Sequence, residues 1–337
     1  MSKHYTIPIF IPELACPNQC IYCNQRNISG QNNSPSIEEV EYTIENHLKT
    51  IDFKNNYTEI GFFGGNFTGI DVNMQIDYLK KAFQYIEKGF VKSIRLSTRP
   101  DYIDQDKLNV LKLYGVKTIE LGVQSTDKDV LIKSDRGYSP KDIHDASVII
   151  KNNGFDLGLQ MMIGLPEDNY KKAIKTAETI ISLKADCTRI YPTLVIKDTK
   201  LKEFYEKNLY KPLSINKAVI ICKEITLLFE RANIPIIKMG LHPSEGLINK
   251  TNLIAGPFHL SFRELVYTAI WNDIFKNNID FSNSFNKIIH IEVASEQFNY
   301  AIGYSAYNKN KLSKRFKKVY FKANKDLLKR KMHVSYS

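Results

Sequence analysis

Short apolar runs alternate with amphipathic segments along the first two-thirds of the chain. Runs rich in β-branched and aromatic residues predict strands at 5–11, 58–63, 93–97, 118–123, 156–163, 188–194 and 234–239. Helical periodicity lies between them, at 36–51, 72–88, 107–113, 140–152, 170–183 and 215–232. Ser36 and Glu39 have the spacing of a capping box at the first of these helices. Because each parallel strand needs a crossover to return to its sheet, this alternation predicts an α/β fold with parallel strands.

The pattern changes after residue 241. Residues 240–262 are rich in Gly, Pro and His and predict a long loop, while 263–275 predicts a helix and 288–293 a strand. We therefore expect a core domain at 1–260 and a small α+β extension at 261–337.

Composition is that of a globular protein, but the charge is unevenly spread. The net charge is +11, and residues 301–337 hold eleven Lys and Arg against one acid, Asp326, which gives this segment +10. Such a block indicates an anionic partner, nucleic acid first, although a solvated basic helix face is the alternative. No run is long and apolar enough to cross a bilayer, and no export signal is visible, so we expect a cytoplasmic protein without a membrane partner.

Aromatic residues are interleaved with these cations. They could stack on unpaired bases or form a small core beneath a basic surface, and the second interpretation is slightly favoured. The residues are Tyr300, Tyr304, Tyr307, Phe316, Tyr320 and Phe321.

Three of the five cysteines, Cys16, Cys20 and Cys23, form a C-x3-C-x2-C motif directly after the first predicted strand. Closely spaced thiolates on one loop can hold an iron–sulfur cluster, and three of them leave one iron of a four-iron cluster open to a small molecule. A structural zinc site is the alternative, but it wants four ligands and no second cysteine pair exists. Cys187 and Cys222 lie singly in apolar surroundings and predict buried structural thiols.

This motif, with the aromatic Tyr22 before its last cysteine, resembles the signature of the radical SAM superfamily. The resemblance implies a partial TIM-like (β/α)6 barrel, a 4Fe-4S cluster and S-adenosyl-L-methionine. In that family the cluster reductively cleaves S-adenosylmethionine to give a 5′-deoxyadenosyl radical, with electrons from a donor such as flavodoxin or ferredoxin.

Further segments that follow predicted strands are similar to the family's cofactor-binding motifs. Gly64 and Gly65 would bring main chain to the amino group of the methionine moiety, because glycine permits that approach. Arg136 would pair with the methionine carboxylate. The resemblance places four more residues around the cofactor, namely Ser97, Glu120, Gln124 and Met162.

Other motifs favour one branch of the superfamily. The segments 98–101, 120–125, 136–137 and 164–166 resemble those shared by the Elongator catalytic subunit and the oxygen-independent coproporphyrinogen oxidases. The segments 189–193 and 262–265 are closer to Elongator. This resemblance implies RNA modification, with tRNA as substrate through the basic C-terminal region. The gap between the first two cysteines is shorter than in Elongator, and we expect no acetyltransferase domain within 337 residues.

Two alternatives remain open from the sequence. One is a coproporphyrinogen oxidase-like enzyme acting on a small acidic substrate. The other is an RNA-binding protein with a structural metal site.

Overall fold

The computed structural model describes residues 3–12, 20–25, 27, 33–241, 244–282 and 284–337. The chain divides into two compact units. The first comprises Met1–Ser214 and Ile225–Phe258, and the second Ile215–Glu224 and His259–Ser337. Helix α9 (Ile215–Arg231) thus contributes to both. The assignment of 1–260 and 261–337 as domains stays a prediction.

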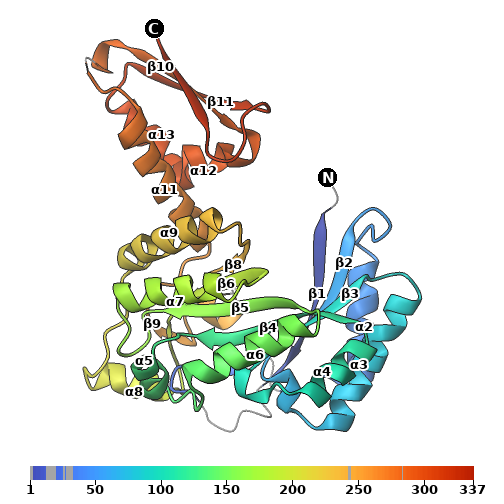
Figure 1. Ribbon diagram of the computed structural model, residues 1–337. Helices are drawn as coiled ribbons and strands as arrows, with labels where there is room; N and C mark the ends of the chain where they lie inside the picture. Colours follow the sequence, from blue (N-terminus) through green and yellow to red (C-terminus); the bar gives the residue numbers. More distant parts are fainter. Residues whose placement is uncertain (1–2, 13–19, 26, 28–32, 242–243, 283) are drawn as a thin grey trace. The chain divides into compact units, whose positions relative to one another are not determined.

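The first unit is built on a seven-stranded parallel sheet (Figure 1). Its order is β1 (His4–Ile11), β2 (Tyr57–Gly64), β3 (Ser93–Thr98), β4 (Val116–Gln124), β5 (Asp156–Ile163), β6 (Cys187–Pro192) and β8 (Ile236–Met239). Each strand pairs in parallel with the next strand of this sheet, and β1 and β8 form the two edges among the described residues. The predicted partial barrel is confirmed, with β8 as a seventh strand.

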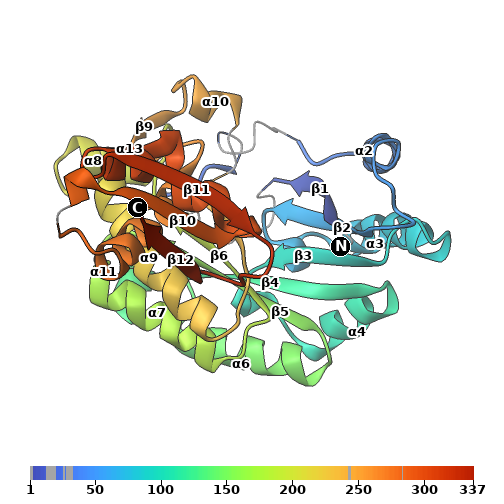
Figure 2. The ribbon, with the colours of Figure 1, turned by 90° about the horizontal axis from the view of Figure 1, so that it is seen from above.

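Helices connect the strands and cover one face of this curled sheet, as Figure 2 shows for α3, α4, α6 and α7. Apolar side chains on the strands explain this arrangement. Each of β2 to β5 carries a fully buried apolar residue, namely Ile60, Ile94, Ile119 and Leu157 in that order. The helices of this unit besides α9 are α2 (Ile37–Leu48), α3 (Val72–Glu87), α4 (Gln105–Leu113), α5 (Lys128–Lys133), α6 (Pro140–Asn152), α7 (Tyr170–Ser182), α8 (Lys200–Glu206) and α10 (Glu245–Ile248).

Local signals in the sequence are mostly realised. Ser36 and Glu39 form the predicted capping box of α2. Cys187 and Cys222 are both buried, and burial raises the pKa of the Cys187 thiol to about 12. The prediction of an unbroken loop at 240–262 was wrong, since it contains α10 and β9 (Leu253–Ala255), which pairs with β7 (Val195–Ile196). Elements this short lack a readable period, and tertiary pairing decides them.

The second unit is a small α+β layer structure, as predicted. Its three-stranded sheet has the order β11 (Lys318–Asn324), β10 (Ile288–Ala294), β12 (Met332–Tyr336), with β10 parallel to β11 and antiparallel to β12. Helices α11 (Phe262–Asn278), α12 (Phe298–Ile302) and α13 (Tyr307–Ser313) complete it. The core gathers Trp271, Phe275, Ile289, Ile291, Val293, Leu312 and Phe316, among others.

The six aromatic residues that the sequence interleaves with the cations divide between core and surface. Phe316 lies in the core, and Tyr300 and Phe321 pack against it. Tyr304, Tyr307 and Tyr320 are exposed. Among the described residues of the whole chain, no helix is both long enough and apolar enough to cross a bilayer.

Candidate active site

The cysteine motif lies directly after β1, and its second half is a tight turn. The N–H of Cys23 donates to the carbonyl of Cys20 at 2.9 Å. Two further backbone bonds hold the turn, from the N–H of Ile21 to the carbonyl of Ser134 (3.3 Å) and from the N–H of Leu201 to the carbonyl of Ile21 (2.7 Å). Cys20 is buried and Cys23 is partly exposed. The two thiols are thus presented by a loop that distant segments fix in place.

Arg136 is buried against this turn. Its Nη1 lies 3.1 Å from the Cys20 Sγ and 2.9 Å from the Tyr22 hydroxyl, its Nη2 donates to the Gly122 carbonyl (2.7 Å), and its Nε donates to the Tyr138 hydroxyl (2.7 Å). Burial lowers the pKa of the guanidinium, but the neighbouring Tyr138, Tyr22 and Cys20 outweigh it, so the pKa stays well above its ordinary value. This places a permanent positive charge beside a cysteine that is predicted to bind metal. Four of the five N–H donors of Arg136 have acceptors among the described residues, whereas the second N–H of Nη2 has none there.

Apolar residues surround the turn. Tyr22 and Met162, both predicted near the cofactor, are buried together with Cys20, and burial raises the pKa of the Tyr22 phenol well above its usual value. An apolar shell around a cluster keeps water and oxygen away from it. The buried side chains packed around the turn also include Ile21, Val130, Leu165, Val195 and Leu201.

The predicted glycine motif occupies the end of β2, beside the end of β1. Gly64 has a φ of +108°, and a Cβ there would lie 2.6 Å from the carbonyl oxygen of Ile11, so only glycine fits. Gly65 follows it. Asn66 is buried, and its Oδ1 accepts a hydrogen bond from the Thr98 hydroxyl (2.6 Å) at the end of β3. The ends of three neighbouring strands are thereby joined at the edge where the cysteine turn begins.

Glu120 lies at the centre of a buried polar network across β3 to β6. Its carboxylate accepts from Arg95 (Nη1, 2.8 Å), from Arg189 (Nη2, 2.8 Å) and from Gln160 (Nε2, 3.0 Å), which also donates to the Ser97 hydroxyl (3.0 Å). Burial alone would raise the pKa of this carboxyl, but Arg189 and Arg95 lower it below its ordinary value. The ion pairs explain how an acid tolerates an apolar strand. The predicted contact of Glu120 and Ser97 with a cofactor stays a prediction.

Gln124 ends β4 in an unusual conformation. Its φ is +63°, and the pairing of β4 with β5 shifts register between Gly122 and Gln124. Its side-chain Oε1 is buried and has no hydrogen-bond partner among the described residues. A buried acceptor of this kind, next to the carbonyl that Arg136 contacts, is suited to a donor group of a bound molecule.

The donor set fits an iron–sulfur cluster better than another metal centre. Cys20 and Cys23 supply thiols, whereas Cys16 lies outside the described residues. Within the described ranges, no group of three or more His, Cys, Asp and Glu side chains could hold a metal ion. The cysteine motif of the sequence offers Cys16 as the third thiol, and its assignment as a cluster ligand stays a prediction.

Sequence reasoning missed several residues of this site. Arg95, Gln160 and Tyr138 had no assigned role, and Arg189 was noted only as part of a motif. The available signal was the presence of charged residues at inward positions of otherwise apolar strands, which requires partners on neighbouring strands. The partners themselves follow only from the strand register.

Comparisons of the chain with known protein families, proteins and solved structures agree with this geometry. The profile of the Radical SAM superfamily matches residues 11–180, and that of the Radical_SAM C-terminal domain matches 185–272. The chain is 31% identical to an uncharacterized protein of Methanocaldococcus jannaschii over 235 residues, covering 66% of this chain and 71% of the relative. It is 26% identical to the tRNA uridine(34) acetyltransferase of Methanocaldococcus infernus, covering 51% of this chain and 36% of the relative.

A solved structure of the archaeal Methanocaldococcus infernus Elp3 has the same fold, with a TM-score of 0.63 at 20% identity over 82% of this chain and 63% of that chain. Members of the superfamily use a 4Fe-4S cluster and S-adenosylmethionine. The two family profiles span most of the chain. This protein therefore belongs to the radical SAM superfamily and is a radical SAM enzyme.

Proposed function

We propose that this enzyme modifies tRNA by radical chemistry. The observation that carries the proposal is the similarity of its radical SAM part to tRNA uridine(34) acetyltransferases. The alignment with the Methanocaldococcus infernus relative spans about a third of that protein. Acetyl transfer is therefore not part of the proposal.

Charge supports an RNA substrate. Residues 301–337 carry a net charge of +10, which is more than a small acidic molecule requires. Within the described part of the second unit, most of these Lys and Arg side chains are exposed. Neutralising phosphates is the most direct use of such a segment.

In this proposal Cys16, Cys20 and Cys23 hold the cluster. When bound, the cluster and S-adenosylmethionine supply a 5′-deoxyadenosyl radical that abstracts hydrogen from the substrate. Arg136 fixes the cysteine turn and offers its remaining N–H to the methionine carboxylate.

The other residues predicted around the cofactor bind and orient S-adenosylmethionine. Gly64 and Gly65 present backbone groups to the amino end of S-adenosylmethionine, and Gln124 accepts a hydrogen bond through its orphan oxygen. Ser97 on β3 and Glu120 on β4 lie beneath the cofactor, while Tyr22 and Met162 exclude water from it. These roles rest on the positions of Gly64, Ser97 and Gln124 at or near the carboxyl ends of β2, β3 and β4, whereas Glu120 lies further back in β4.

The test is anaerobic reconstitution with iron and sulfide, followed by incubation with dithionite, S-adenosylmethionine and bulk tRNA. We expect 5′-deoxyadenosine to form, and to form faster with tRNA than with coproporphyrinogen. Mass spectrometry of the digested tRNA then identifies a modified nucleoside. Stimulation by the porphyrinogen and none by tRNA would contradict the proposal and favour the small acidic substrate.

A further inference from the structure

The second unit contains a loop that the radical chemistry does not explain. Strand β10, helix α12, helix α13 and strand β11 follow one another, and the two short helices are joined by four residues, from Gly303 to Ala306. Three of the four have positive φ: +89° at Gly303, +49° at Ser305 and +56° at Ala306. Ser and Ala seldom adopt this conformation, and each such residue costs about 1 kcal/mol or more.

The loop is held from beneath by buried polar groups. The N–H of Tyr304 donates to the hydroxyl of Thr268 (2.8 Å), and Asn308 Nδ2 donates to the Thr268 carbonyl (3.0 Å) and the Ala301 carbonyl (3.2 Å). A Cβ on Gly303 would lie 2.9 Å from the Thr268 methyl group. The conformation is therefore fixed in advance by the fold.

The outer side of the loop is exposed and leads into cations. Tyr304 and Tyr307 are 39% and 55% exposed, and Ser305 is exposed between them. The exposed cations Lys309, Lys311, Lys314 and Arg315 follow on α13 and the turn after it. Backbone, hydroxyl and cationic groups that face solvent together are suited to phosphates, and exposed rings are suited to unstacked bases.

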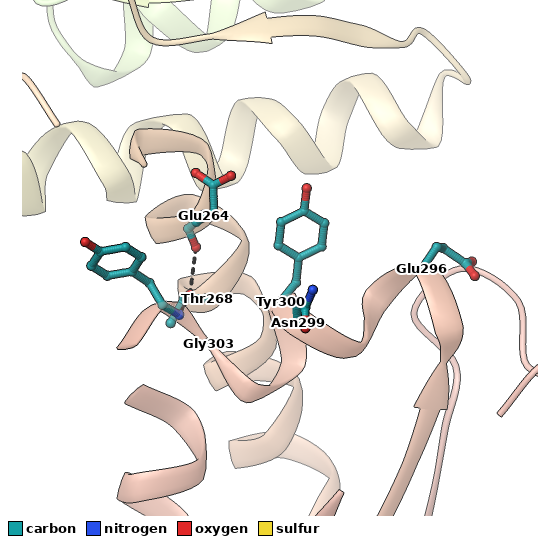
Figure 3. Close-up of a pocket in the computed structure, with 7 residues that line it drawn as sticks. Glu264, Thr268, Glu296, Asn299, Tyr300 and Gly303 are labelled. Atoms are coloured by element: carbon teal, nitrogen blue, oxygen red, sulfur yellow. Dashed lines mark hydrogen bonds between the residues drawn. The ribbon is translucent and has the colours of Figure 1, made fainter. Parts of the chain in front are cut away.

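The inner side of the same loop borders a cavity of about 360 Å³ (Figure 3). Figure 3 shows the Glu264 carboxylate and the Tyr300 ring projecting to the same side of their helices. Carboxylates repel a phosphate but accept hydrogen bonds from the exocyclic amino group of a base. The cavity is lined by Glu264, Thr268, Glu296, Asn299, Tyr300, Gly303 and Tyr304.

We propose that the Gly303–Ala306 loop and α13 bind a single-stranded segment of RNA, with phosphates along the outer side of the loop and an unstacked, amino-bearing base in the cavity. RNA-binding modules of the KH type clamp about four nucleotides with a Gly-x-x-Gly loop between two helices. Here Ala306 stands at the second glycine position and still adopts the positive φ. This inference deepens the proposed function, on which it rests, because it names the surface that holds the RNA.

The test measures binding of a fluorescein-labelled RNA heptamer to the full chain by anisotropy. Ser305→Asp puts a carboxylate where a phosphate would lie, and aspartate tolerates the left-handed conformation. We expect affinity to fall about tenfold, since a phosphate contact is lost and repulsion added. Ser305→Asn is the matched neutral control and should stay within about twofold. Ser335→Asp adds the same charge on the exposed strand β12 and should also stay within about twofold.

Three outcomes would overturn the inference. Equal losses in Ser305→Asp and Ser335→Asp would show a diffuse electrostatic effect. Binding to phosphatidylserine vesicles that Ser305→Asp abolishes, without binding to RNA, would make a membrane the partner. If an oligo(U) heptamer binds as tightly as an oligo(C) heptamer, the cavity does not hold an amino-bearing base.

Failure of this inference can be told apart from failure of the proposed function. RNA-independent 5′-deoxyadenosine formation should be unchanged in Ser305→Asp, because the loop lies outside the cofactor bed. If tRNA fails to stimulate the wild-type enzyme, the proposed function is wrong. If tRNA stimulates wild type and Ser305→Asp equally, only the loop assignment is wrong.

Discussion

The two sheets of this protein use charged residues in opposite ways. In the seven-stranded sheet, Glu120 is 1% exposed and is enclosed by Arg95 and Arg189. In the three-stranded sheet, Glu292 of β10 meets Lys322 of β11 at 2.8 Å in an exposed pair. The first arrangement is costly to disturb and positions neighbouring groups, whereas the second is readily exchanged with solvent or with a ligand.

The surroundings of the two sheets extend this contrast. The buried Glu59 and Glu120 of the first sheet are paired with Arg95 and Arg189. The second unit keeps a large positive excess, and its exposed face carries Lys318, Lys322 and Tyr320, the last stacked on His290 at a ring separation of 5.0 Å. In the first sheet the paired charges join neighbouring strands, whereas in the second unit the positive excess is left exposed to solvent.

The sharpest test of this contrast is the same substitution in both sheets. Glu120→Gln leaves the buried Arg189 without its carboxylate partner and Arg95 with Glu59 alone, and we expect the free energy of unfolding to fall by about 3–5 kcal/mol. Urea denaturation followed by circular dichroism measures it. Glu292→Gln is the matched control and should leave the urea midpoint unchanged. Similar shifts in both variants would refute the contrast.

A partly buried acid in the loop after β5 gives the next largest effect. Asp168 accepts hydrogen bonds from the N–H of Gly164 (2.7 Å) and of Asn169 (2.8 Å), yet burial raises its pKa to about 6. The unfolded chain releases this proton near pH 4 and the folded chain only near pH 6, so this carboxyl destabilises the fold as pH rises through that window. The loss is at most about 3 kcal/mol and is constant above the window.

Asp168→Asn removes this titration. The difference in unfolding free energy between wild type and variant should therefore change between pH 4.5 and pH 7. The wild type should become less stable relative to the variant as pH rises. Asp326→Asn, in an exposed turn, is the control and should show a constant difference. A constant difference for Asp168→Asn would contradict the raised pKa.

The cysteine turn offers a test of positioning. Arg136→Lys keeps the charge but cannot reach Cys20, Tyr22, Tyr138 and Gly122 together, so we expect 5′-deoxyadenosine formation to fall about 10–100-fold. Iron and sulfide content and the visible spectrum of the reconstituted protein show whether the cluster is retained. Arg231→Lys, at the exposed end of α9, should behave as wild type. Full activity in Arg136→Lys would mean that charge alone suffices.

The smallest effect concerns a single cation of the second unit. Lys314→Ala should weaken RNA binding a few-fold and reduce the slope of log affinity against log salt by about one, because one phosphate contact is lost. Lys54→Ala, an exposed cation of the first unit, should leave the slope unchanged. An unchanged slope in Lys314→Ala would exclude that lysine from the interface.

Much of the architecture follows from the sequence because it depends on local periodicity. All seven strands of the main sheet and the longer helices between them are apparent from the pattern of apolar residues, and the capping box at Ser36 is realised in detail. The short helices α5 and α8 were not predicted. The short strands β7 and β9 are not apparent, because two or three residues carry no period and pair only when the fold brings them together.

The sequence by itself determined the cysteine motif, the strands of the main sheet and the concentration of charge in residues 301–337. These are properties of residue type and spacing along the chain. Only the tertiary structure decided that Glu120 is enclosed by Arg95 and Arg189, that Arg136 contacts Cys20, and that three residues of the Gly303–Ala306 loop have positive φ. Such contacts join residues many positions apart, and strand register and loop conformation, which no local pattern encodes, set them.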